Sequence, residues 1–246
     1  MAPLKAGTPL LQTRGLALRA AGRQLVRGLD WDVRLGERWC VLGRNAVGKS
    51  TLLRALAGLP VPERDGEVRW FERPQDEWMP ADAARVRAFV PQQPGDRFPL
   101  SVMHLLSLAN ASVTATVANG VLAALDAADL AGRRVTELSG GERQRVALAQ
   151  GALQGAPLLL MDEPVSFQDP AHQQQVGRWL TELPDSALVL SAHDVNWVAR
   201  VATHVLLLYG GGAWDAGPAT QMLEASRLER AYGCAWRESG GVWVAA

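Results

Sequence analysis

The stretch Gly43-Arg44-Asn45-Ala46-Val47-Gly48-Lys49-Ser50-Thr51 decides how the rest of this 246-residue chain is interpreted. It fits the phosphate-loop pattern G-x-x-x-x-G-K-[ST] at every fixed position. A short apolar run, residues 38–42, precedes it, and Leu52, Leu53 and Leu56 follow at helical spacing. The sequence therefore predicts a buried strand, a glycine-containing loop and a helix, in that order.

A loop of this kind lets successive backbone N–H groups surround an anion at the positive end of a helix. Lys49 can then reach the terminal phosphates of a nucleotide, and the Ser50 hydroxyl can hold magnesium. The alternative is a glycine-rich turn with an incidental lysine. Because strand and helix flank the loop, we favour a nucleotide site formed by residues 43–51.

Composition limits the classes of function. Hydrophobic residues make up 48% of the chain, and 25 basic residues balance 25 acidic ones. The chain can form one large α/β domain or two small ones, and no overall basic field attracts nucleic acid. The longest apolar runs, residues 158–161 and 205–209, are far shorter than the roughly 20 residues of a membrane span. Residues 1–13 lack the apolar region of a secretory signal, and Cys40 and Cys234 have no metal or redox spacing, so we expect a reducing cytoplasm.

The first part of the chain predicts a small antiparallel sheet packed against the nucleotide core. Residues 28–33 alternate apolar and charged side chains, as a half-exposed strand does. Residues 16–18 form a second strand, and Asp65-Gly66 starts a third over residues 67–71. Gly58 is the expected C-cap of the helix that follows the phosphate loop.

The middle of the chain predicts a strand and then a helical insertion. Residues 86–90 are a strand candidate, followed by an extended linker, residues 91–94, that carries Gln92. From Ser101 to about Leu130 the apolar residues recur at helical spacing.

A second unusual stretch is Leu138-Ser139-Gly140-Gly141-Glu142. Ser139 and Glu142 have the spacing of a capping box at the start of a helix over residues 143–154. Gly140 and Gly141 leave the first N–H groups of that helix uncovered, so it could bind phosphate. On capping alone, a purely structural helix is the favoured interpretation.

Two further buried strands end in polar residues. Residues 158–161 lead into Asp162-Glu163, and residues 187–191 lead toward His193. Ligands bind open α/β sheets at the carboxyl ends of the strands, so one acid could hold magnesium while the other activates water. An acidic turn and a structural histidine are the alternatives, and the phosphate loop favours the catalytic reading. A hairpin near residues 205–214 and a small helical end complete the chain.

The order of these motifs resembles that of ATP-binding-cassette (ABC) ATPases over about residues 10–232. The stretch LSGGERQRVALA, residues 138–149, is more specific than the phosphate loop. The resemblance implies a P-loop NTPase core with a parallel central sheet, an N-terminal antiparallel β subdomain and an inserted helical subdomain. It divides the chain into residues 1–92, 93–155 and 156–246 of a single nucleotide-binding domain.

The resemblance also implies roles for site residues, with ATP and magnesium as cofactors. Gln92 would sense magnesium and the attacking water, and Asp162 would hold the metal through water. Glu163 would be the general base, and His193 would contact the γ-phosphate. In a head-to-tail homodimer, Ser139, Gly140 and Gly141 of one subunit would close on ATP held by the other, with Asp169 in the loop between the subunits.

Within the family, the chain looks most like the ATPase subunits of importers for cobalamin, haem and iron–siderophore complexes. Residues 90–93, 170–175 and 191–196 carry that resemblance. It implies a separate permease dimer, a periplasmic binding protein as an indirect partner, and a position on the cytoplasmic face of the inner membrane. The alternatives are an exporter ATPase subunit and, less favoured because the chain is short and has no basic patch, an ABC ATPase acting on DNA or ribosomes.

Three residues depart from the family pattern. Ala46 replaces a usual glycine, Gln168 replaces a usual leucine, and Ala20 stands where an aromatic side chain usually stacks on adenine. The last departure predicts modest ATP affinity and loose base selectivity, unless Arg19 or Arg23 covers the base.

Overall fold

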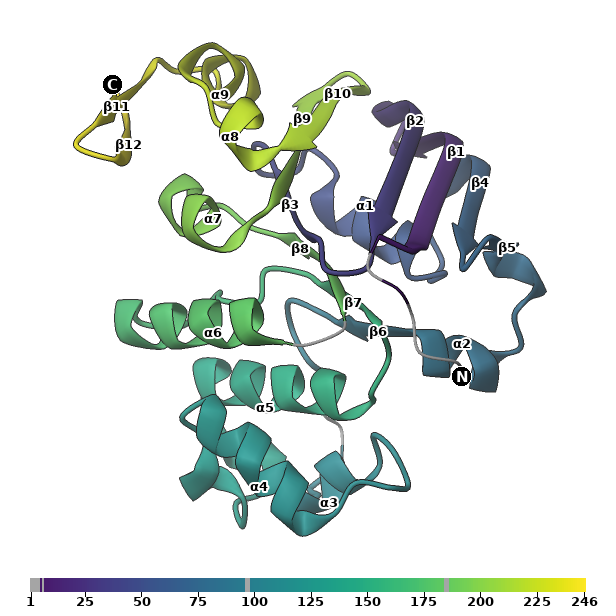
Figure 1. Cartoon of the computed structure of the whole chain (residues 1–246), viewed down its shortest axis with the longest axis vertical. Coiled ribbons are helices and arrows are strands. Elements are labelled where there is room, and N and C mark those ends of the chain that lie inside the picture. Colours follow the sequence, from purple (N-terminus) through teal and green to yellow (C-terminus); the bar gives the residue numbers. More distant parts are fainter. Residues whose placement is uncertain (1–4, 6, 96–97, 184–185) are drawn as a thin grey trace.

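A six-stranded sheet runs through the centre of the molecule (Figure 1). The computed structural model describes residue 5 and residues 7–95, 98–183 and 186–246; residues 1–4 and 6, part of the segment in which we expect no secretory signal, lie outside this description. The strand order is β10-β9-β3-β8-β7-β6, in which every neighbouring pair is parallel except β10 with β9. The strands are β3 (Arg38–Leu42), β6 (Arg87–Val90), β7 (Leu158–Met161), β8 (Ala187–Ser191), β9 (His204–Gly210) and β10 (Ala213–Pro218).

Both faces of this sheet are buried. Successive residues of a strand point to opposite faces, so Cys40 packs in one hydrophobic core and Val41 in the other. Leu159 and Leu160 divide between the two cores in the same way. The short apolar runs predicted as buried parallel strands are confirmed. Burial also raises the pKa of the Cys40 thiol, as expected for a small buried hydrophobe.

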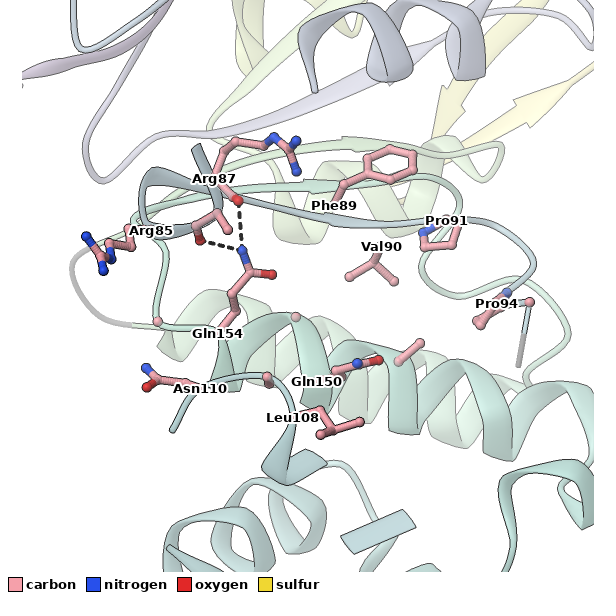
Figure 2. A pocket seen from close by; sticks show the side chains of 16 residues that line it. Arg85, Arg87, Phe89, Val90, Pro91, Pro94, Leu108, Asn110, Gln150 and Gln154 are labelled. Atoms are coloured by element: carbon pink, nitrogen blue, oxygen red, sulfur yellow. Dashed lines mark hydrogen bonds between the residues drawn. The ribbon is translucent and has the colours of Figure 1, made fainter. Parts of the chain in front are cut away.

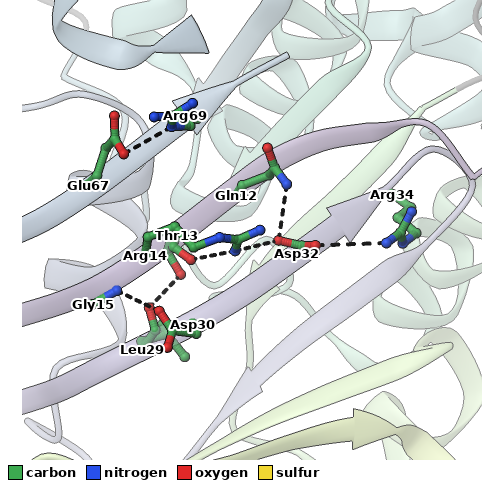
Figure 3. Close-up of polar contacts among 10 residues, drawn as sticks. All are labelled: Gln12, Thr13, Arg14, Gly15, Leu29, Asp30, Asp32, Arg34, Glu67 and Arg69. Atoms are coloured by element: carbon green, nitrogen blue, oxygen red, sulfur yellow. Dashed lines mark hydrogen bonds and ion pairs between the residues drawn. The ribbon is translucent and has the colours of Figure 1, made fainter. Parts of the chain in front are cut away.

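A second sheet, with strand order β2-β1-β4-β5, covers one side of the core. Leu29 and Val33 of β2 are fully buried, whereas Asp32 points outward and pairs with Arg14 at 2.7 Å and Arg34 at 3.8 Å (Figure 3). The predicted half-exposed antiparallel strand is confirmed. The bounds are β1 (Pro9–Ala20), β2 (Arg23–Arg34), β4 (Glu63–Trp70) and β5 (Arg73–Pro74).

Helices flank the two sheets. Helix α1 (Lys49–Leu56) lies between them in Figure 1, and Gly58, with φ +69°, follows it as the predicted C-terminal glycine. Helices α3 and α4 form the end of the molecule away from the antiparallel sheet (Figure 1). The remaining helices are α2 (Pro80–Val86), α3 (Val102–Ser107), α4 (Ala115–Ala124), α5 (Gly140–Leu153), α6 (Pro170–Glu182), α7 (Val195–Val201), α8 (Ala219–Met222) and α9 (Ala225–Tyr232).

Three sequence predictions about element boundaries are wrong. Gly66 does not start a strand but lies inside β4 with φ +80°, where an added Cβ would come within 2.4 Å of the Gly15 carbonyl oxygen. Val86 ends a helix that begins with Pro80 at its first turn and is not the first residue of β6. The predicted helices near the end of the chain are present as α8 and α9, but they are not its last elements, because β11 (Trp236–Ser239) and β12 (Val242–Ala245) form a hairpin after α9.

No helix in the part of the chain that the structure describes is both long enough and apolar enough to cross a membrane.

Candidate active site

The phosphate-loop sequence joins β3 to α1, as predicted. Gly43 has φ +143° and Gly48 has φ +116°, a backbone that other residues rarely adopt. A Cβ on Gly43 would lie 2.5 Å from the Leu208 carbonyl oxygen, and one on Gly48 would lie 2.9 Å from Leu25 Cβ. Both glycines are therefore required by the backbone and by their neighbours.

Lys49 is 5% exposed, and its Nζ lies inside the loop. It donates hydrogen bonds to the carbonyl oxygens of Gly43 at 2.9 Å and Arg44 at 3.2 Å. Burial lowers the pKa of Lys49, and the nearby carboxylates of Glu163 and Asp162 oppose that shift. A phosphate beside the ammonium would likewise favour its charged form.

Ala46 adopts a left-handed backbone with φ +59°. The loop accommodates the Cβ there, but the left-handed backbone costs a residue with a Cβ about 1–2 kcal/mol of conformational free energy. The departure from the usual glycine therefore adds local strain without changing the course of the loop.

We expect Ala46→Gly to raise the free energy of unfolding by up to about 1 kcal/mol, because relief of strain exceeds the added entropy of the unfolded chain. Urea unfolding measures the change. The matched control is Ala123→Gly on the exposed side of α4, which should cost about 1 kcal/mol because its backbone is helical. Equal losses in the two variants would contradict the assignment of strain at Ala46.

The two carboxylates follow β7, at its carboxyl end. Glu163 Oε2 accepts hydrogen bonds from Gln92 Nε2 at 2.7 Å and from Ser166 Oγ at 2.8 Å. The other oxygen, Oε1, contacts His193 Nε2. Gln92, Glu163 and His193, which three different strands carry to one sheet edge, thus meet around one carboxylate.

Asp162 is 5% exposed and lies beside Ser191, the last residue of β8. The Ser191 hydroxyl donates to Asp162 Oδ1 at 2.6 Å and accepts from the Glu163 backbone N–H at 2.9 Å. Ser191 thus fixes both acids, a role that the sequence analysis missed. Its position at the end of a neighbouring strand was the available signal.

A cavity of about 630 Å³ joins the phosphate loop to this cluster. Its walls bring together Lys49 and Ser50 on one side with Gln92, Glu163 and His193 on the other. The β1–β2 turn closes it through Ala20, Ala21 and Arg23. The cavity thus places the ammonium of Lys49 and the hydroxyl of Ser50 in one space with the carboxylate of Glu163.

The stretch around Ser139 forms a separate hollow of about 450 Å³. The predicted capping box is present: Ser139 Oγ accepts from Glu142 N at 3.4 Å, and Glu142 Oε2 accepts from Ser139 N at 2.7 Å, which lowers the pKa of Glu142. Gly140, Gly141 and Asp169 line the same hollow. One chain therefore does not bring these residues to Lys49.

Asp169 and Gln168 also have structural roles in the chain. Asp169 caps α6 by accepting from the backbone N–H groups of Ala171 and His172, both at 3.0 Å, and these contacts lower its pKa. The Asp-Pro pair at a helix start was a signal for this cap. Gln168 is buried and donates to the Pro164 carbonyl oxygen at 3.2 Å.

Tyr232 of α9 is a further residue beside the phosphate loop that the sequence analysis did not assign. Burial raises its pKa to about 12, and the neighbouring Gly43 backbone N–H opposes that rise. Its buried hydroxyl makes no hydrogen bond to any residue that the structure describes.

The sequence profile of the ABC transporter family matches residues 26–166, which is more than half of the chain. The chain belongs to this family. It is accordingly an ATP-binding subunit that hydrolyses ATP, and the predicted fold class is confirmed.

Two import ATPases and one transporter structure are similar to most of this chain. A hemin import ATP-binding protein, HmuV, from Streptomyces coelicolor is 37% identical over 94% of this chain and 85% of its own length. A vitamin B12 import ATP-binding protein, BtuD, from Escherichia coli is 36% identical over 85% of this chain and 87% of its own. The structure of an ABC transporter of proposed metal-chelate type, in an inward-facing conformation, superposes with a TM-score of 0.76 at 25% identity, covering 97% of this chain and 96% of that one.

Proposed function

We propose that this ABC ATPase energises the import of a metal chelate, of the haem or cobalamin type, through a separate permease dimer. The names of the relatives at 37% and 36% identity support this substrate class. The observation that supports the chemistry is Glu163, held by Gln92 and Ser166 at the wall of the phosphate-loop cavity.

In this proposal Lys49 and the loop N–H groups hold the phosphates of ATP, and Glu163 removes a proton from the attacking water. Gln92 and Ser166 occupy Oε2, so Oε1 is the oxygen available as base once His193 turns from it toward the γ-phosphate. Residues 43–51 are the proposed nucleotide contacts.

Ser50, Gln92 and Asp162 fit a magnesium ion. All three offer hard oxygen atoms, and Asp162 is nearly buried, with one carboxylate oxygen fixed by Ser191. Magnesium, when bound with ATP, neutralises charge that develops on the phosphates. We expect hydrolysis to stop in excess EDTA and to return when magnesium is added.

A second copy of the chain would complete the site. The hollow around Ser139 and the cavity around Lys49 are separate within one chain, which supports the head-to-tail dimer implied by the sequence. Ser139, Gly140, Gly141 and Asp169 would then face ATP bound to the partner.

A cleft of about 830 Å³ is the proposed docking groove for the permease (Figure 2). Phe89 and Val90 of β6 lie on one side, and Gln150 of α5 and Gln154, which directly follows α5, lie on the other, with Leu108 at the rim. Gln154 Nε2 donates to the Arg87 carbonyl oxygen at 2.9 Å, which ties α5 to β6. Pro91 and Pro94 both line this groove and flank Gln92 in the chain, so a partner in the groove lies close to the Glu163 cluster.

We expect Leu108→Asp to reduce ATP-driven uptake by about ten-fold or more, because it places a charge at an apolar contact. Leu108 is 63% exposed, so the isolated subunit should keep its ATPase rate. The control is Val117→Asp, which alters an apolar side chain of 53% exposure on α4 outside the groove. Equal uptake by both variants would contradict docking at the groove.

The import proposal is tested by reconstituting this chain with its permease in vesicles and adding the periplasmic binding protein. We expect ATP-driven uptake of haem or cobalamin from the binding-protein side. Hydrolysis coupled to movement in the opposite direction would identify an exporter, and hydrolysis with no effect of any permease would argue for a non-transport ATPase.

A further inference from the structure

The turn between β1 and β2 forms one wall of the nucleotide cavity. Ala21 and Gly22 both have left-handed backbones, with φ +49° and +73°, which makes a tight two-residue connection. Ala20 and Arg23 are therefore direct register partners across the hairpin. Side chains of such partners project on the same face, with Cβ atoms about 4.5–5.5 Å apart.

This wall has no large aromatic side chain. Among the described residues that line the cavity, none is Phe, Tyr or Trp. The methyl group of Ala20 can cover only a small part of a base. Ala20 and Arg23 project from the same face of the hairpin, so the small side chain of Ala20 leaves space on that face for the side chain of Arg23.

Two arginines lie near this wall, and their contacts differ. Arg19 is held away: its Nε donates to Gln24 Oε1 at 3.0 Å, and its Nη1 lies 3.7 Å from Asp65. Arg23 is exposed and lines the cavity, and within the described part of the chain its guanidinium makes no hydrogen bond or ion pair. Of these two arginines, Arg23 is the one whose guanidinium is free to contact a ligand in the cavity.

We propose that Arg23 supplies the face on which the base of the bound nucleotide stacks, in place of an aromatic side chain at position 20. A guanidinium is planar, delocalised and weakly hydrated, and it stacks on the faces of aromatic rings. The short side chain of Ala20 leaves the room that such stacking needs. The inference rests on ATP occupying this cavity.

The competing role for Arg23 is attraction of the phosphates. The two roles differ in what they require of the ligand, because tripolyphosphate carries the charge of ATP without the base. They also differ in what they require of the side chain. Lys keeps the positive charge that attracts phosphates but lacks the planar guanidinium that stacks on a base.

The test measures equilibrium binding of ATP and of tripolyphosphate to the full chain and to Arg23→Ala, Arg23→Lys and Arg19→Ala. We expect Arg23→Ala to weaken ATP about five-fold or more and to leave tripolyphosphate unchanged. Arg23→Lys should recover little of the loss, and Arg19→Ala should match the parent protein.

Equal weakening of the binding of both ligands in Arg23→Ala, with recovery in Arg23→Lys, would overturn stacking. Unchanged ATP binding in Arg23→Ala would overturn it as well. If the parent protein binds tripolyphosphate but not ATP, the proposed base contact is wrong and the phosphate site stands. If it binds neither ligand, the proposed nucleotide site is wrong.

The register partner provides a rescue. Adding Ala20→Tyr to Arg23→Ala should restore an aromatic face and lower KM for ATP about five-fold relative to Arg23→Ala, with kcat nearly constant. In the parent background the same Ala20→Tyr change should have little effect, because Arg23 already covers the base. A five-fold fall in KM in the parent background would show an uncovered base and would overturn the proposal.

Discussion

Replacing Glu163 with Gln should lower kcat for ATP hydrolysis by about a hundred- to ten-thousand-fold, which is the usual contribution of general-base catalysis. The amide has the same shape, and its oxygen can still accept from Gln92 Nε2 and Ser166 Oγ, which lie 2.7 Å and 2.8 Å from Oε2 in the parent protein. What it lacks is a basic oxygen facing the water. ATP binding should persist, because Lys49 and the phosphate loop are unchanged.

Steady-state hydrolysis and gel filtration together measure this effect. Because hydrolysis is blocked, a stable dimer of the Glu163→Gln protein should accumulate in the presence of ATP and elute earlier than the parent protein. The control is Glu182→Gln at the exposed end of α6, which makes the same chemical change away from the cavity and should leave both readouts unaltered. A Glu163→Gln protein that keeps most of its turnover would show that the base lies elsewhere.

Local sequence patterns predicted those parts of the site that depend on neighbouring residues in the chain. The phosphate loop, the capping box of Ser139 and the strand before Asp162 each lie within a few residues of their signal, and each is confirmed as a structural element. Glycine positions indicate backbone geometry and apolar runs indicate burial, so these elements could be predicted from a single sequence.

Contacts that depend on strand pairing were not predictable in the same way. Ser191 reaches Asp162 only because β8 lies beside β7, and Arg23 faces Ala20 only because the β1–β2 turn has two residues. Register is a tertiary property, and a change of one residue moves a side chain to the other face. The β11–β12 hairpin is a different omission: Gly240 and Gly241, with φ +60° and +78°, are a two-residue turn signal that the sequence analysis did not use.

Replacing Ser139 with Arg should abolish turnover while ATP binding remains. In the proposed dimer, the hollow around Ser139, Gly140 and Gly141 receives the γ-phosphate end of ATP held by the partner, and a long side chain would fill it. The phosphate loop lies in a different cavity of the same chain, so its affinity should be unchanged.

The substitution also removes a helix cap, which costs about 0.5–2 kcal/mol of stability. Thr114→Arg is the matched control, because Thr114 caps α4 by accepting from the Val117 backbone N–H at 3.3 Å and lies outside both cavities. It should lose similar stability and keep its ATPase rate. Equal loss of turnover in the two variants would attribute the effect of Ser139→Arg to unfolding.

Mixing Ser139→Arg with Lys49→Ala then tests whether the sites are shared between subunits. In each heterodimer one composite site carries both lesions, and the other pairs an intact Lys49 with an intact Ser139. Neither variant should hydrolyse ATP alone, whereas an equal mixture should recover up to about a quarter of parental turnover, since half of the dimers are mixed and each has one intact site. If mass spectrometry shows heterodimers and no activity returns, then either each site lies within one chain or hydrolysis needs two intact sites. A tandem protein that carries both lesions in the same half has no intact composite site, but its other half keeps both Lys49 and Ser139. Activity of this tandem would show that each site lies within one chain, whereas shared sites require it to be inactive beside an active parental tandem.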